Sequence, residues 1–276
     1  MNNELIHSNP PHIHTKRTIT GIRADILIAL APTVIMSALT KGGKSLLIVL
    51  VSLAAAVISD VLCDLIFRKR TAVLELESAV TGVIFALMLP YRIPLWIAAV
   101  GAAIAVIVFK QFVGLIGRSY LHPAAGAYLT ISCLLLIIAP FGIPSGSICA
   151  GVAPTLIVGL IYLLIRKVIQ LRIPLLYTLA YVFAMTVSES LGAVSTSEFI
   201  PGSLLLTAVF IAPAYASSPA TPAGRAVFAV FGGFIAYAFS NMLLSEQALA
   251  LSIIIMNILS PIIERFTIPK SWRYQK

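Results

Sequence analysis

The few ionisable side chains inside apolar stretches are the first candidates for chemistry. Asp60 and Asp64 stand one helical turn apart, and Lys110 precedes Gln111 late in another apolar stretch. A charge within a membrane span is costly and often functional. Lys110 could hold an anionic head group, or its long side chain could extend to the cytoplasmic surface. For the two aspartates we favour a structural role, with Asp64 paired to Arg68 at the i,i+4 spacing.

Other residues with chemical potential are scattered. Asp25, near the start of the first apolar stretch, is expected to pair with the nearby Arg23 in the same way. Cys63, Cys133 and Cys149 show neither a CxxC pair nor a cluster spacing, so we expect no iron–sulfur site and no metal site within this chain. The sequence contains no HExxH, no GxSxG and no Gly-rich dinucleotide fingerprint, which argues against hydrolytic or NAD chemistry in this chain.

The composition indicates what kind of scaffold positions these groups. Of the 276 residues, 59% are hydrophobic and only 11% are charged, and the mean hydropathy is +1.02. A soluble domain needs more charge than this to cover its surface, whereas about 20 mostly apolar residues form one membrane span. We therefore predict an all-α polytopic membrane protein in contact with the lipid bilayer. The basic residues behind the net charge of +9 lie in short loops, so nucleic acid is not expected as a partner.

Breaks at glycine, proline or charged residues divide the chain into about ten expected transmembrane helices. Five spans per half is an odd number, so any repeat must be inverted. The predicted parts are a polar cytoplasmic leader at 1–21, five-helix repeats at 22–140 and 141–264, and a basic cytoplasmic tail at 265–276. The expected spans are 22–40, 45–67, 78–90, 94–116, 123–140, 149–165, 174–190, 202–213, 226–244 and 248–264.

The distribution of lysine and arginine predicts the orientation. With the N-terminus in the cytoplasm, sixteen of these residues fall on the cytoplasmic side, and only Lys41, Lys44 and Arg92 fall outside. This asymmetry is the positive-inside pattern of membrane proteins. Both chain ends are therefore predicted to be cytoplasmic.

The third and eighth spans, 78–90 and 202–213, are unusually short and end at Pro90 and Pro213. They occupy the same place in each half of the chain. Matched broken helices are the best sequence indicator of a central binding site in inverted-repeat membrane proteins, because their unwound backbone can face polar ligand groups. The alternative is that both are simply short helices that fill space.

Several stretches resemble one family, RnfD/NqrB: the RnfD protein of the Rnf electron-transport complex and its relative, the NqrB protein of the sodium-translocating NADH:quinone reductase. The similarity covers nearly the whole chain. One motif departs slightly, because the family usually carries Asn where His122 stands. The similar stretches are residues 11–18 (PHIHTKRT), 25–32 (DILIALAP), 78–82 (SAVTG) through 89–90 (LP), 110–117 (KQFVGLIG) with 122–124 (HPA), and 256–264 (MNILSPIIE).

The resemblance implies a membrane subunit of an Rnf-like complex in the cell membrane of a prokaryote, with an inverted five-plus-five architecture. Such a protein holds a flavin or quinone near the membrane midplane and passes electrons across the membrane, and ion translocation could be coupled to this. The implied partners are other membrane subunits, one of them carrying a flavin, and quinone. The chain would then be part of an oxidoreductase translocase rather than a self-sufficient enzyme. The resemblance leaves open the coupling ion, the electron donor and the electron acceptor.

Two departures from the family pattern bear on the cofactor. Family members usually carry FMN on the Thr of an Asp-x-x-Ser-Gly-Ala-Thr loop, but here Gly142 replaces the acid and Ile148 replaces the acceptor. A hydrocarbon side chain cannot form the phosphoester. The nearby Thr155 is the fallback acceptor, but it lacks the motif around it. We therefore expect a non-covalent flavin, FMN or riboflavin, and no covalent FMN. In the eighth span Ala214 replaces the Asp of the family's Thr-Asp-Pro, which removes the basis for a carboxylate contact there.

The candidate site is the place where the two short spans meet, with Lys110 as an anchor for a head group such as a flavin phosphate. Its residues are Thr81, Gly82, Pro90, Lys110, Pro213, Ser217 and Ser218. Two further functions stay open at this point. The same fold could serve as a channel or transporter for small solutes, or as a non-redox scaffold for other subunits.

Overall fold

The computed structural model describes residues 18–66, 76–112, 121–138, 146–190, 201–215 and 217–268. These residues form ten α-helices, as the sequence predicted, and two of the helices continue as π-helices. The helices are α1 (Ile19–Lys41), α2 (Gly43–Ile66), α3 (Glu77–Met88), α4 (Leu95–Ile104) with η2 (Ala105–Phe112), α5 (Pro123–Ile138), α6 (Ala153–Ile165), α7 (Arg172–Ser190), α8 (Gly202–Leu206) with η4 (Thr207–Ile211), α9 (Pro222–Ser240) and α10 (Ser245–Thr267).

Six of these helices are long and apolar enough to cross a membrane: α1, α2, α4 with η2, α7, α9 and α10. The chain is therefore a multi-pass membrane protein. The sequence predicted two short helices, whereas the described residues form four shorter apolar helices, which include α5 and α6. A helix of 13 residues, such as α6, rises only about 20 Å, which is less than the roughly 30 Å of the hydrocarbon core.

Local sequence explains where several helices begin and end. The Thr18 side chain accepts a hydrogen bond from the Gly21 N–H and so caps α1. Gly42, at φ 85°, separates α1 from α2 in the left-handed region that glycine adopts readily. At α9, Thr221 caps the N–H of Gly224, and Pro222 occupies the first turn.

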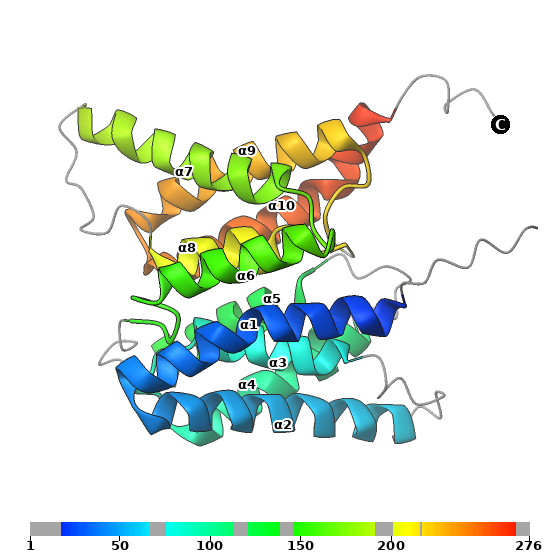
Figure 1. Ribbon diagram of the computed structural model, residues 1–276, viewed down its shortest axis with the longest axis vertical. Coiled ribbons are helices and arrows are strands. Elements are labelled where there is room, and N and C mark those ends of the chain that lie inside the picture. The colour runs from blue at the N-terminus through cyan, green and yellow to red at the C-terminus, as the bar shows by residue number, and fades with distance from the viewer. Residues whose placement is uncertain are drawn as a thin grey trace, which may run out of the picture.

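The helices separate into two groups (Figure 1), with α1–α5 in the lower half of the view and α6–α10 in the upper half. The groups meet where α1 packs on α6 and α5 packs on α10. An inverted repeat is expected to pair equivalent helices in this way. The start of α1 and the end of α10 lie at the same end of the molecule, at the right of Figure 1, which we call the terminal face. The expected repeat boundary at 140/141 falls outside the described residues.

The two broken spans lie deepest in the protein. Ten of the twelve residues of α3 are buried, and so are all ten residues of α8 and η4. The longer helices α1 and α2 instead expose many large apolar side chains. The helices that the sequence identified by their shortness therefore form the centre, and the long helices surround them.

Candidate functional site

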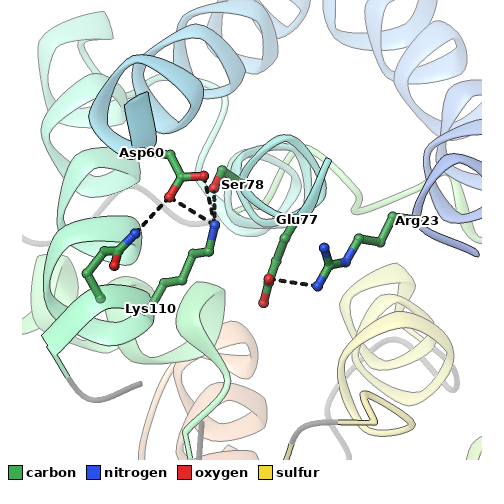
Figure 2. Close-up of polar contacts among 6 residues, drawn as sticks. Arg23, Asp60, Glu77, Ser78 and Lys110 are labelled. Carbon is green, nitrogen blue, oxygen red and sulfur yellow. Dashed lines mark hydrogen bonds and ion pairs between the residues drawn. The ribbon is translucent and has the colours of Figure 1, made fainter. Parts of the chain in front are cut away.

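A buried ion pair lies near the terminal face of the first half (Figure 2). The Lys110 ammonium donates to both carboxylate oxygens of Asp60, at 2.9 and 2.8 Å, and to the Ser78 hydroxyl at 2.8 Å. The Lys110 side chain is only 12% exposed. The expected extension of Lys110 to the surface is thus wrong, because a carboxylate and a hydroxyl within the protein bind its charge instead.

The π-helical backbone explains how one carboxylate holds two consecutive side chains. Gln111, the next residue of η2, donates to Asp60 Oδ1 at 3.1 Å. A π-helix has more residues per turn than an α-helix, so neighbouring side chains diverge less around the axis and both can reach α2. Lys110 neutralises Asp60 here, which leaves this cluster poorly suited to anchor a phosphate. Asp64 is buried too, and its expected partner Arg68 lies outside the described residues.

Two further ion pairs join separate helices. Arg23 donates to Glu77 Oε2 at 2.8 Å and so links α1 to α3 (Figure 2). The sequence suggested that Asp25 pairs with Arg23, and this prediction is wrong. Asp25 accepts from Arg166 Nε at 3.2 Å and from the Tyr162 hydroxyl at 3.1 Å, which links α1 to α6. Arg23 and Asp25 are two positions apart on a helix and therefore point in different directions.

A cavity of about 400 Å³ opens at the terminal face, beside Arg23 and Glu77. The starts of α1, α3 and α5 and the segment after η4 enclose it. Its wall is mostly apolar, with Ile22, Ile26, Ile84 and Phe210 among its members. The Arg23–Glu77 pair also lines it. Such a cavity suits a ligand that is apolar over most of its surface.

A few polar side chains project into this apolar cavity, and two of them have no partner in the described part of the chain. His122 Nδ1 and Ser217 Oγ are buried without a hydrogen bond there, and both residues line the cavity, as does Thr81. Burial lowers the pKa of His122 to about 4, so its imidazole is neutral at physiological pH. A buried polar atom without a partner costs about 1–3 kcal/mol, which a ligand in the cavity would relieve.

The structure brings together only some of the predicted site residues. Thr81 and Ser217 line the cavity, and Pro213 and Ser218 line a smaller adjoining cleft. Gly82 has a packing role instead, because a Cβ there would stand 2.9 Å from a carbonyl oxygen of α2. The other members of the cavity wall that sequence reasoning did not select include Arg23, Glu77, His122 and Tyr215. Of these, only His122 carried a signal, its departure from the usual Asn.

Pro90 lies away from the cavity, beside the loop that precedes α6. It pairs with Ser147 in an isolated antiparallel bridge, and the Ile148 N–H donates to the Leu89 carbonyl at 2.9 Å. The Ile148 side chain is fully buried. The Thr155 hydroxyl, the fallback flavin acceptor, donates to the Val152 carbonyl at 2.7 Å. The loop position at which the sequence resemblance implied a flavin acceptor thus packs into the protein through an apolar side chain.

Comparison with known proteins places the whole chain among components of redox membrane complexes. A model of the NQR2, RnfD, RnfE family matches residues 6–140 and 131–273. The chain is 27% identical to the component designated D of the Na⁺-translocating ferredoxin:NAD⁺ oxidoreductase complex of Acetobacterium woodii, over 95% of this chain and 93% of that protein. It is 29% identical to the corresponding component of the ion-translocating oxidoreductase complex of Methanosarcina acetivorans, over 95% of each. It is 22% identical to the corresponding component of the proton-translocating ferredoxin:NAD⁺ oxidoreductase complex of Clostridium ljungdahlii, over 95% of this chain and 94% of that protein.

Proposed function

Because the chain belongs to the NQR2, RnfD, RnfE family, we propose that it is a membrane subunit of an ion-translocating oxidoreductase complex that supports electron transfer across the membrane. The observation that carries this proposal is the match along nearly the entire length of relatives that are named as components of such complexes. The relatives' names give sodium for one complex and protons for another. The coupling ion therefore differs among the relatives' complexes.

The cavity is the proposed site for a non-covalent flavin or a quinone. Its volume falls within the range of about 300–1,000 Å³ typical of small-molecule sites. A flavin or quinone ring is flat and apolar on its faces, and carries carbonyl groups at its edge. Apolar side chains such as Ile84 and Phe210 suit the faces of the ring. The hydroxyls of Thr81 and Ser217 and the neutral imidazole of His122 suit its edge, since they can donate or accept hydrogen bonds. The bound group would supply the electron-carrying chemistry.

Covalent FMN is not part of the proposal. The buried hydrocarbon side chain of Ile148 cannot carry a phosphoester, and the Thr155 hydroxyl is engaged within its own turn. The proposed partners are other membrane subunits, one of which carries a flavin, and quinone.

We further propose that the terminal face is cytoplasmic and that the halves 22–140 and 141–264 are inverted repeats. Among the described residues, seven lysines and arginines lie toward the terminal face and three lie at the opposite end, as the positive-inside rule requires. The first group comprises Arg23, Lys110, Arg166, Lys167, Arg172, Arg225 and Arg265, and the second comprises Lys41, Lys44 and Arg92. The membrane in question is the cell membrane of a prokaryote.

An ultraviolet and visible spectrum of the purified protein, before and after acid precipitation, tests the flavin proposal. We expect flavin to be released into the supernatant. Flavin in the pellet would show a covalent bond. A folded protein without flavin absorbance would favour a non-redox scaffold or a channel for small solutes. Of these two, the channel would be active alone in liposomes.

A variant pair assigns the flavin to the cavity. Ser217→Leu fills part of the cavity and is expected to lose the flavin. Thr186→Val, on an exposed face of α7, should retain it. Equal flavin content in both variants would place the cofactor elsewhere.

A further inference from the structure

A second, smaller hollow adjoins the cavity at the terminal face. It has a volume of about 100 Å³ and lies between the turn after α6 and the segment after η4. We call it the basic cleft, because its polar members are Lys167, Gln170, Ser218 and Arg225. No acidic side chain is found among the described residues that line it. The cleft therefore combines two cations with neutral hydrogen-bonding groups.

Lys167 stands in the cleft at a position that favours glycine. It follows α6 with φ 52°, in the left-handed region. The Val168 N–H donates to the Leu163 carbonyl and the Lys167 N–H to the Leu164 carbonyl, both at 2.9 Å, which is the Schellman arrangement at a helix end. A side chain at this position is costly relative to glycine. The Schellman end of α6 thus places a lysine in the cleft wall.

Arg225 supplies the second cation in a fixed orientation. Its Nε donates to the Pro219 carbonyl at 3.0 Å and its Nη1 donates to Gln170 Oε1 at 3.1 Å. These bonds engage two of the five guanidinium N–H groups and hold the plane of the group in place. Arg225 is half-buried. A planar guanidinium with its orientation set in advance is well suited to bind phosphate oxygens.

Tyr215 separates the basic cleft from the cavity. It lines both hollows, and its hydroxyl donates to the Val168 carbonyl. A third hollow of about 30 Å³ lies between them, and it shares Phe210 with the cavity and Pro213 with the cleft. The three hollows are thus neighbours around one aromatic side chain, so a single ligand could reach from the apolar cavity to the cleft.

We propose that the basic cleft binds the phosphate group of an organic phosphate ester. Two sources have this chemistry: the phosphate of a flavin mononucleotide whose ring lies in the cavity, and the head group of an anionic phospholipid at the membrane surface. The first source rests on the proposed function, and the second does not. In either case the phosphate anchor that the sequence suggested at Lys110 lies instead at Lys167 and Arg225.

The test compares ligand binding to the full-length protein purified in detergent and freed of flavin. Dissociation constants for FMN and riboflavin are measured by fluorescence, and retained phosphatidylglycerol is measured by native mass spectrometry. Arg225→Gln and Lys167→Gly each remove one cation. Lys167→Gly also relieves the left-handed backbone, so a loss of binding in that variant cannot be attributed to misfolding. Arg172→Gln is the matched control, because Arg172 is exposed at the same face and does not line the cleft.

Each outcome either identifies the source of the phosphate group or shows that the basic cleft does not bind one. If FMN binds about tenfold tighter than riboflavin, and both cleft variants but not the control lose this difference, the phosphate belongs to the flavin. If the two flavins bind alike or not at all, and phosphatidylglycerol is lost only in the cleft variants, the phosphate belongs to a lipid. If neither ligand distinguishes the cleft variants from Arg172→Gln, the proposal is overturned. Absence of flavin binding alone counts against the proposed function and leaves the lipid measurement to judge the cleft.

Discussion

The two central broken spans are held in place by different means. The first turn of α3 is tied by charge, since Glu77 pairs with Arg23 and Ser78 binds the ammonium of Lys110. The segment formed by α8 and η4 contains no charged residue. In and just after it, Ser203 Oγ and Ser217 Oγ are buried without a partner in the described part of the chain. One broken span therefore has the polar side chains of its first turn bound by the protein, and the other leaves polar groups for something else to satisfy.

This difference suggests that the two broken spans have different roles at the cavity. Paired charges fix the position of α3 and thereby one wall of the cavity. The first half also supplies most of the apolar wall and His122, while the second half contributes Phe210 and Ser217, whose hydroxyl a ligand could engage. If charge holds α3 in place, loss of its ion pairs should destabilise the protein more than loss of a polar group in α8.

The largest effect is expected from Lys110→Met. This variant leaves the Asp60 carboxylate buried without its cation, which typically costs about 3–5 kcal/mol. The thermal unfolding midpoint in detergent should fall sharply. The double variant Asp60→Asn/Lys110→Met should recover most of the loss, because a neutral pair no longer buries a charge. In the second half, Ser203→Ala should change the midpoint little. A loss in the double variant as large as in the single one would show that charge is not what holds α3.

The next effect is a pH dependence that arises at His122. The native state keeps this imidazole neutral, with a pKa of about 4, whereas an unperturbed His has a pKa of 6.5. The unfolded chain therefore binds the extra proton first as the pH falls below 6.5, and the folded state loses stability until the pH reaches about 4. The difference corresponds to about 3 kcal/mol. In His122→Asn, the thermal unfolding midpoint should change less between pH 7.5 and pH 5 than it does in the unmodified protein. An unchanged profile in that variant would assign the pH dependence to other groups.

A smaller effect is expected from Gly82→Ala, which tests the packing of α3 against α2. The new Cβ would lie 2.9 Å from the Ser52 carbonyl oxygen and 3.0 Å from the Ala56 Cβ. Overpacking of this kind costs about 1–3 kcal/mol. The control is Gly43→Ala, where a Cβ meets nothing within 4 Å. The unfolding midpoint should fall in the first variant only, and equal midpoints would mean that α2 and α3 can separate at little cost.

The smallest effect is expected from Arg23→Gln. The side chains of Arg23 and Glu77 are 20% and 31% exposed, so water screens this pair more than the Lys110–Asp60 pair. A pair of this kind contributes about 1 kcal/mol or less. The midpoint should shift slightly, and the shift should shrink as salt is added. A loss comparable to that of Lys110→Met would place the main charge support of α3 at Glu77.

Local patterns in the amino-acid sequence were enough to predict the class of the protein, the ten helices and the central place of the two broken spans. Hydropathy over about 20 residues predicts a helix, and glycine, proline and charged residues end it. The two short spans pointed to a central site because both end at proline and occupy the same place in each half of the chain. The family resemblance likewise rested on stretches of consecutive residues.

The packing of separate helices determines which charges pair and which polar groups share a cavity. Lys110 and Asp60 are 50 residues apart, Arg23 and Glu77 are 54 apart, and Arg166 and Asp25 are 141 apart. Sequence reasoning assigned Asp25 to its near neighbour because spacing along one helix is all that it can evaluate. The meeting of His122 and Ser217 in the wall of one cavity depends in the same way on how separate helices pack. A side chain's partner is set by packing in three dimensions, which no local pattern contains.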